Sequence, residues 1–220
     1  MPHQPSIRTR GFLFDMDGTL VDSTAVVEAI WTGFAREHGL DAQEILGFSH
    51  GRQTADTLAR FLPRLDPAER ARIERDLAEQ EFARTEGIAE IPGAAALLSA
   101  LREAGAPVAM VTSASRDLAL ARMRLASVPV PDVVIAAEDA TRSKPAPDGY
   151  LRAAGLLGVP ADACTVFEDA EAGLRAGLAS RAAVVVVGGH VSATTEGLTR
   201  IPDYTSLTVS AGEGAFSLNA

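Results

Sequence analysis

The sequence is poor in cysteine and contains no long apolar segment. Its 220 residues include one cysteine, Cys164, so an internal disulfide is excluded, and the apolar residues around it indicate a buried small side chain. No apolar run approaches the ~18 residues that a membrane-spanning helix needs. Residues 1–10 lack the apolar core of a signal peptide. We therefore expect a cytoplasmic protein without a membrane partner.

Positive charge is also scarce, and lysine is nearly absent. The chain has 20 basic residues and 29 acidic ones, a net charge of −9, which argues against nucleic acid and anionic membranes as partners. Lys144 is the one lysine among the basic residues. A GC-rich genome would account for the excess of arginine. The same bias makes a retained lysine informative, because some sites accept only a compact ammonium group.

Apolar residues, in contrast, make up 47% of the chain, enough for a sizeable core in one large domain or a domain with an insertion. Strands are expected at 12–14, 108–111, 133–135, 166–167 and 183–187, and helices at 93–104, 117–126, 146–157 and 170–178. This alternation predicts an α/β fold with a doubly wound parallel sheet. A hairpin is expected near the C-terminus, with strands at 207–209 and 216–218 and a turn at 212–214.

Residues 23–87 show no strand signal. They predict helices at 23–38, 42–46, 54–61 and 66–85. We expect Ser23 or Thr24 to cap the first of these. The strand at 12–14 could not stay buried alone, so it must belong to the later sheet, and the helical block is an insertion. The predicted domains are a core of residues 1–20 and 89–220 and an all-helical cap of residues 21–88.

The apolar strand at 12–14 runs directly into two carboxylates, Asp15 and Asp17, which are followed by Gly18 and Thr19. Open α/β sheets bind ligands at the carboxyl ends of their strands. Two acidic side chains at i and i+2 would repel each other there, and a hard divalent cation with oxygen ligands would offset that repulsion. The alternative is a strand followed by an ordinary acidic turn.

Three further polar groups follow strands or precede helices. Thr112 and Ser113 suit a phosphate at a helix approach, or a simple helix cap. Lys144 lies in a loop before a helix, where a surface lysine is the alternative. Glu168 and Asp169 follow a strand, where negative charge also favours a helix N-terminus. Each group is unspecific alone, but their placement at successive strand–helix junctions favours one shared site.

Together these residues resemble the haloacid dehalogenase superfamily, whose four motifs occur here in order across nearly the whole chain. The resemblance is carried by Asp15-Met16-Asp17-Gly18-Thr19, Thr112, Lys144-Pro145 and Glu168-Asp169 with Ala172-Gly173. The helical block is similar to the small cap of this superfamily. Residues 49–54 and 167–173 look like the branch of sugar-phosphate, 2-deoxyglucose-6-phosphate and glycerol-phosphate phosphatases, in the β-phosphoglucomutase-like subfamily. Glu171 departs from that branch, which usually has proline at this position.

The resemblance implies a two-step phosphatase mechanism. Asp15 would attack phosphorus and form an aspartyl-phosphate, while Asp17 would protonate the leaving alcohol and then activate water. Mg²⁺ would bind the Asp15 carboxylate, the Asp17 backbone carbonyl and Asp169, with Glu168 in support.

It also implies roles for the remaining groups. Thr112 and Ser113 would hold the phosphoryl oxygens, and Lys144 would neutralise phosphate and Asp15. The expected substrate is a small sugar or polyol phosphate, which the sequence does not name, and the expected state is a monomer.

Other functions share parts of this pattern. A dehalogenase needs no leaving-group acid at Asp17, and a phosphonatase uses a cap lysine, which residues 23–87 lack. A β-phosphoglucomutase-like phosphomutase shares the cap and motifs, although such enzymes tend to use a cap lysine. A non-catalytic phosphosugar-binding protein would not need the pair Asp15 and Asp17. The phosphomutase and the binding protein stay as alternatives to the phosphatase.

Substrate specificity is expected from the cap, because the core motifs contact only the phosphoryl group. The polar loop with His50 and Arg52 could lie over the sheet edge when the cap closes, where its donors suit sugar or polyol hydroxyls. The alternative is a helix–helix connector with a solvated arginine. Trp31 and Phe34 are expected in the core of the cap.

Overall fold

A computed structural model describes residues 6–212 and 214–219 of the chain. Its central feature is a six-stranded parallel sheet in the order β6-β5-β2-β7-β8-β9. These strands are β2 (Gly11–Phe14), β5 (Val108–Val111), β6 (Val133–Ile135), β7 (Cys164–Glu168), β8 (Ala183–Val187) and β9 (Thr199–Ile201). The prediction of an α/β fold with a doubly wound parallel sheet is confirmed.

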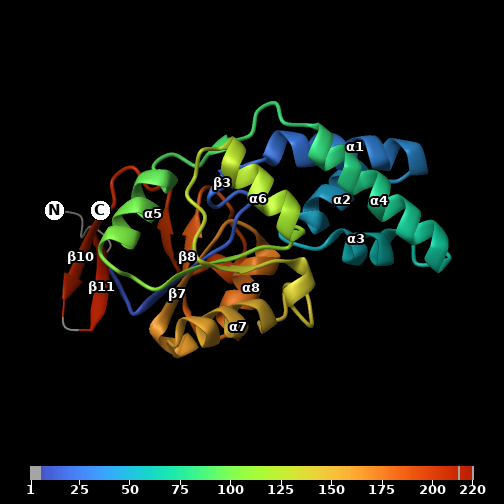
Figure 1. The fold of residues 1–220 in the computed structure, drawn as a ribbon. Coiled ribbons are helices and arrows are strands. Elements are labelled where there is room, and N and C mark those ends of the chain that lie inside the picture. The colour runs from blue at the N-terminus through green and yellow to red at the C-terminus, as the bar shows by residue number, and fades with distance from the viewer. Residues whose placement is uncertain (1–5, 213, 220) are drawn as a thin grey trace.

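Helices cover both faces of this sheet (Figure 1). They are α5 (Ala94–Glu103) and α6 (Arg116–Leu125) on one face and α7 (Asp148–Leu157) and α8 (Glu171–Ala179) on the other. Strand β2 lies in the middle and is buried on both sides, which is why it consists of apolar residues without alternation.

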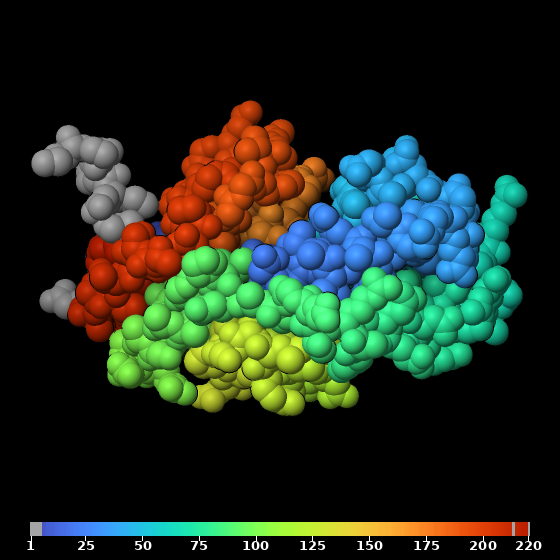
Figure 2. Space-filling model, turned by 90° about the horizontal axis from the view of Figure 1, so that it is seen from above, coloured from blue at the N-terminus to red at the C-terminus, as the bar shows by residue number. Residues whose placement is uncertain are grey.

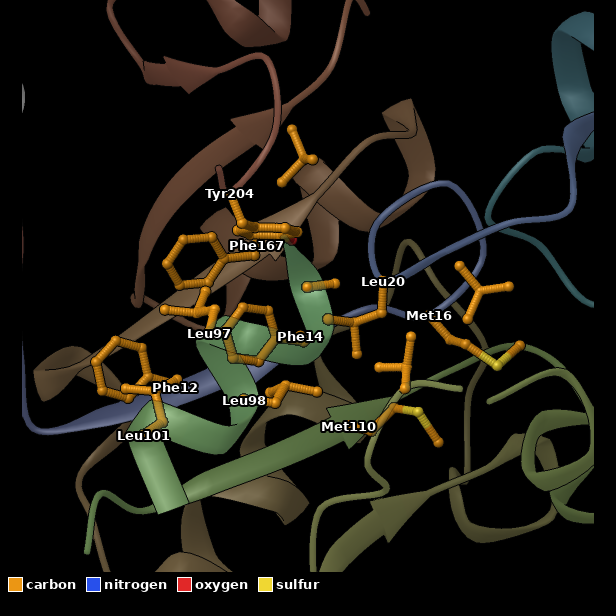
Figure 3. Packing of buried hydrophobic residues seen from close by; sticks show 14 of the residues in the cluster. Phe12, Phe14, Met16, Leu20, Leu97, Leu98, Leu101, Met110, Phe167 and Tyr204 are labelled. Atoms are coloured by element: carbon orange, nitrogen blue, oxygen red, sulfur yellow. The ribbon is translucent and has the colours of Figure 1, made fainter. Parts of the chain in front are cut away.

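The two faces of β2 build two separate cores. Phe12 and Phe14 point to the α5/α6 face, where the ring of Phe14 stacks on Phe167 with centroids 4.6 Å apart and Tyr204 closes the cluster (Figure 3). Leu13 points to the α7/α8 face. Strand β2 is thereby fixed from both sides, and so is the acidic segment that follows it.

The inserted segment forms a helical cap at one end of the molecule, coloured blue to blue-green in Figure 2. Its helices are α1 (Thr24–His38), α2 (Ala42–Ser49), α3 (Thr54–Phe61) and α4 (Pro67–Ala83). Trp31 and Phe34 are buried and meet edge to face at 5.4 Å, as expected for cap-core residues. The Asp66 carboxylate accepts hydrogen bonds from the first turn of α4, which begins at Pro67.

The junction between cap and core is a two-stranded ribbon that the sequence analysis did not predict. Strands β3 (Val21–Asp22) and β4 (Ala89–Glu90) pair antiparallel, with Val21 opposite Glu90 and Asp22 opposite Ala89. Both passages of the chain between core and cap therefore lie side by side. The proposed domain boundaries at 20/21 and 88/89 fall on this ribbon and stay a prediction.

The expected C-terminal hairpin is present as β10 (Thr208–Gly212) and β11 (Ala215–Asn219), while position 213 of its turn lies outside the described residues. The analysis missed β1 (Ser6–Thr9), which pairs with β11 and completes a three-stranded antiparallel sheet at the end opposite the cap. It also missed β9. Short 3₁₀ turns lie at Ala137–Asp139, Ala161–Ala163 and Ala193–Thr195.

In the described segments, no helix is both long and apolar enough to cross a bilayer.

Several helix boundaries differ from expectation by one to three residues, and those of α2 and α7 border loops that carry site residues. Helix α2 continues to Ser49, so that Ser49 ends a helix and does not begin the polar loop. Helix α7 begins at Asp148 and not at 146, because Pro145 and Pro147 lack backbone donors and Pro147 disfavours the helical conformation at the residue before it.

Candidate active site

The motif residues meet at the carboxyl edge of the sheet, beneath the cap. Asp15 follows β2, Thr112 follows β5, and Glu168 ends β7 with Asp169 next in the chain. A cavity of about 280 Å³ opens at this edge. Residues lining it include Asp15, Asp17, Thr112, Ser113, Asp169, His50 and Arg52. Residues that follow three strands of the sheet and residues of the cap thus surround one small space.

Lys144 is buried at the centre of the site, which excludes the surface-lysine alternative. Its Nζ donates to Asp15 Oδ1 at 2.5 Å, to Glu168 Oε1 at 2.6 Å and to the Val111 carbonyl at 3.1 Å. These three acceptors use all three ammonium protons. Burial lowers the pKa of Lys144, but the two carboxylates raise it by more, so the group stays charged.

Glu168 is fully buried and held by a residue that the sequence analysis missed, Tyr150. The Tyr150 hydroxyl donates to Glu168 Oε1 at 2.5 Å, and burial and the Glu168 charge raise the pKa of Tyr150 well above 10. A Cβ at position 173 would lie 1.8 Å from Glu168 Oε1, so Gly173 is the residue that makes room for this carboxylate. Nothing in the local pattern separates Tyr150 from an ordinary core tyrosine of α7.

Asp169 lies against the turn that follows β2. The Thr19 hydroxyl donates to Asp169 Oδ1 at 3.1 Å. Gly18 has φ +78°, and a Cβ there would lie 2.1 Å from Asp169 Oδ2. Both the backbone conformation and the neighbouring carboxylate therefore require glycine at this position. Burial and the Glu168 charge raise the pKa of Asp169 to about 8.

The donor set fits a hard divalent cation such as Mg²⁺. Asp15, Glu168 and Asp169 each offer a carboxylate oxygen, and these oxygens all lie within 4.8 Å of one another. Three carboxylates face the one ammonium of Lys144, which leaves an excess of negative charge. Within the described residues, Glu168 Oε2 is buried without a hydrogen-bond partner. Burial and the Glu168 charge raise the pKa of Asp15 well above 3.8, against the opposing effect of Lys144, and a cation would relieve this repulsion.

Asp17 is held by two donors from outside its own loop. Ser23 Oγ donates to Asp17 Oδ1 at 2.6 Å, and Arg122 Nη1 donates to the same oxygen at 2.9 Å. Ser23 occupies the N-cap position of α1, as expected, but its side chain makes no capping bond and has Asp17 as its partner instead. Arg122 was missed, because one arginine in a helix of an arginine-rich chain carries no signal.

The two residues expected to hold phosphate differ in their present partners. Thr112 is buried, and its hydroxyl accepts a hydrogen bond from the backbone N–H of Ala114 at 3.1 Å. Ser113 Oγ donates to the Gly51 carbonyl in the cap at 2.9 Å. In this structure the Ser113 hydroxyl therefore joins core to cap, and its contact with a phosphoryl group stays a prediction.

The polar cap loop lies over the site and contacts the core. Gly51 has φ +72°, and a Cβ there would come within 3.1 Å of the Ala170 side chain at the start of α8. His50 and Arg52 line the cavity on either side of Gly51. The Arg52 guanidinium lies 4.2 Å from the Phe48 ring centroid, and burial lowers its pKa. The loop is thus more than a connector exposed to solvent.

Glu171, the departure from the family pattern, has a structural partner set. Its carboxylate accepts from Ser192, Thr194 and Arg175 at 2.6 Å each, and His190 Nε2 lies 3.2 Å away. Burial raises the pKa of Glu171, but these hydrogen bonds outweigh it and lower the pKa to about 2. Glu171 therefore ties the start of α8 to the segment after β8.

This arrangement is that of a candidate phosphate and metal site, and the class of the protein follows from the sequence comparison. A family model described as haloacid dehalogenase-like hydrolase matches residues 9–181, and the chain belongs to this family. The predicted superfamily is confirmed.

Three known proteins illustrate the relationship. Hexitol phosphatase A of Escherichia coli (strain K12) is 47% identical over 82% of this chain and 84% of its own. 2-Deoxyglucose-6-phosphate phosphatase 1 of Saccharomyces cerevisiae is 36% identical over 79% of this chain and 77% of its own. The crystal structure of β-phosphoglucomutase from Clostridium difficile superposes with a TM-score of 0.80 at 19% identity, covering 91% of this chain and 93% of its own, and shares the fold. The named phosphatases confirm the prediction of a phosphoric monoester hydrolase.

Proposed function

We propose that the protein hydrolyses phosphate monoesters of small sugars or polyols, with hexitol phosphates as the first candidates, through an aspartyl-phosphate intermediate. The observation that carries the proposal is the buried ion pair of Asp15 and Lys144 at 2.5 Å, whose Asp15 lines the same cavity as Asp17. The 47% identity to hexitol phosphatase A supports the choice of substrate.

The two aspartates divide the chemistry. In the first step a carboxylate oxygen of Asp15 forms a bond to phosphorus, the bond between phosphorus and the substrate oxygen breaks, and Asp17 gives its proton to the leaving alcohol. In the second step Asp17 takes a proton from water, whose oxygen attacks phosphorus and releases phosphate from Asp15. Asp15 returns to a carboxylate and Asp17 regains its proton, so the cycle is balanced.

The remaining groups bind the phosphoryl group and stabilise its charge. Lys144 faces the oxygen of Asp15 with a fixed positive charge before substrate arrives, which is the arrangement that lowers a barrier without reorganisation. Asp15, Asp169 and Glu168 would hold Mg²⁺, which supplies positive charge to the phosphoryl oxygens when bound. Thr112 lies beside the nucleophile in the cavity wall and would bind a phosphoryl oxygen.

The cap side of the cavity suits hydroxyl groups. Gln53, Thr54, Glu74 and Arg52 line it and offer amide, hydroxyl, carboxylate and guanidinium groups. A volume of about 280 Å³ fits a small polar molecule rather than a large ligand. These features support a sugar or polyol as the leaving group.

The proposal is tested by phosphate release from a panel of hexitol phosphates, 2-deoxyglucose 6-phosphate and glycerol phosphate, with Mg²⁺ and with a chelator. We expect Mg²⁺-dependent release that is fastest for a hexitol phosphate and absent in Asp15→Asn. Isomerised hexose phosphate without free phosphate would show a phosphomutase. Binding of the panel without turnover would show a binding protein.

A further inference from the structure

One buried guanidinium links the cap to Asp17. Arg122 is on α6 of the core and is 3% exposed. Its Nη1 donates to Asp17 Oδ1 at 2.9 Å, and its Nη2 donates to Glu81 Oε2 at 3.1 Å. Glu81 belongs to the last turn of α4, the cap helix that lies against α6. Arg122 therefore bridges two carboxylates that belong to different parts of the molecule.

The guanidinium at the centre of this bridge is buried and forked. The exposed fractions of the side chains are 4% for Arg122, 15% for Glu81 and 29% for Asp17. A planar guanidinium that binds two carboxylates through two different nitrogens is fixed in orientation. Removing one partner of a buried arginine also destabilises the fold much more than removing a partner of a surface arginine. In the described residues the Arg122 Nε is buried without a partner, so the hydrogen bonds of the guanidinium go to these two carboxylates.

Movement of the cap away from the core would break the contact between Arg122 and Glu81 but not the contact between Arg122 and Asp17. Asp17 and Arg122 both belong to the core, whereas Glu81 leaves with α4 when the cap moves. Ser23, the other donor to Asp17, lies directly after the junction strand β3, so it also responds to the position of the cap. The surroundings of Asp17 therefore depend on whether α4 is docked on α6.

We propose that Arg122 is a positioning residue that couples closure of the cap to the placement of the Asp17 carboxylate. The inference rests on the role of Asp17 in the proposed function. Glu81 fixes the guanidinium when the cap is docked, and the guanidinium in turn fixes Asp17. Proton transfer to the leaving alcohol is thereby tied to the closed state, in which the substrate is covered by the cap.

The test compares two substrates with different need for proton transfer. A hexitol phosphate has a poor alkoxide leaving group, whereas p-nitrophenyl phosphate has a good one. We expect Arg122→Met to lower kcat on the hexitol phosphate about 10- to 100-fold, part of the ~10²–10⁴ that a general acid supplies, and to change kcat on the aryl phosphate less than about threefold. Glu81→Gln should show the same selectivity with a smaller loss. Arg124→Met, an exposed arginine of the same helix, is the matched control and should retain normal rates.

A double variant separates positioning from a general structural effect. If Arg122 acts through Asp17, then Asp17→Asn combined with Arg122→Met should be no slower on the hexitol phosphate than Asp17→Asn alone. The inference would be overturned if the double variant lost kcat by the product of the two single losses. It would also be overturned if Arg122→Met lowered kcat by the same factor on both substrates. Should Arg122→Met fail to fold, Glu81→Gln combined with Asp17→Asn gives the same comparison.

The outcomes also separate this inference from the proposed function. If Asp17→Asn lowers kcat by the same factor on both substrates, the general-acid role is wrong. If Asp17→Asn is selective for the hexitol phosphate while Arg122→Met and Glu81→Gln are not, only the positioning role is wrong.

Discussion

Replacing Lys144 by arginine or by methionine separates the shape of this side chain from its charge. The ammonium donates to three acceptors that converge on one nitrogen, at 2.5, 2.6 and 3.1 Å, and its side chain is 6% exposed. No nitrogen of arginine carries three protons, and a planar guanidinium in the same space would collide with the walls of the site, one of which is the Tyr150 ring at 5.2 Å.

The size of the effect follows from what each variant leaves behind. Lys144→Met leaves Asp15 and Glu168 buried without their cation, and breaking a buried ion pair in this way costs about 3–5 kcal/mol. For a chain of this length each kcal/mol shifts Tm by ~2–4 °C, so we expect Tm to fall by roughly 6–20 °C without metal. Lys144→Arg keeps the charge but misplaces it, and we expect kcat to fall by about 10²-fold or more.

The measurements are Tm with a chelator present and kcat on a hexitol phosphate with saturating Mg²⁺. Arg142→Lys is a matched control, because Arg142 pairs with Asp148 at the surface with a side chain that is 70% exposed, and it should change neither quantity. If Lys144→Arg retains near-normal kcat, the argument that the site needs a compact ammonium is refuted.

Four further predictions concern the remaining groups. Asp15→Asn should abolish turnover and leave Tm at or above the wild-type value, because it removes one of the crowded charges; residual phosphatase rate measured in this variant would disprove the covalent mechanism. Asp17→Asn should lose ~10²–10⁴ in rate on a hexitol phosphate and much less on an aryl phosphate, as measured by steady-state kinetics. The metal-free protein should lose stability as pH rises from about 4 to 8, because burial raises the pKa of Asp169 from 3.8 to about 8, and Mg²⁺ should therefore raise Tm more at pH 8 than at pH 5; an equal Mg²⁺ effect at both pH values would contradict this. Arg52→Ala should lower kcat/KM on sugar and polyol phosphates and spare a small aryl phosphate, and equal effects on both would remove the cap loop from substrate recognition.

The parts of the fold that the sequence predicted well are those with a dense local signal. Strands β5, β6 and β8 have the expected bounds because each is a short run of apolar residues rich in valine. Helix α4 was expected to begin at Pro67 because a capping aspartate and a proline stand together there.

The missed elements depend on partners far away in the chain. Strand β1 is defined by its pairing with β11, near the opposite end of the sequence, and β9 is a three-residue strand whose pattern is mostly exposed. Neither has a periodicity that a single sequence could reveal, because a strand of three or four residues shows at most two alternations.

The candidate active site also contains residues with a local sequence signal and residues that are defined by distant contacts. Asp15 and Asp169 belong to short motifs with their own glycines, whose necessity the structure explains through the Cβ positions at Gly18 and Gly173. Tyr150 and Arg122 act on those motifs from helices α7 and α6, and only the assembled sheet brings them there. A residue whose role is defined by tertiary contact alone leaves no trace in its own neighbourhood.

The ribbon of β3 and β4 makes the cap exchangeable as a unit. Since Asp22 faces Ala89 across an antiparallel pair, the two ends of the inserted segment are separated by no more than the ~5 Å between paired strands. A turn of two residues, such as Asn-Gly, would close that gap. In the described residues, the apolar cluster of the cap is also separate from the two clusters around the sheet, except at Ile88. This residue packs against the cap cluster and against the cluster on the α5/α6 face of the sheet. Caps of other lengths and surfaces could therefore be grafted at this point, provided that they supply partners for Asp17 and Arg122 in place of Ser23 and Glu81.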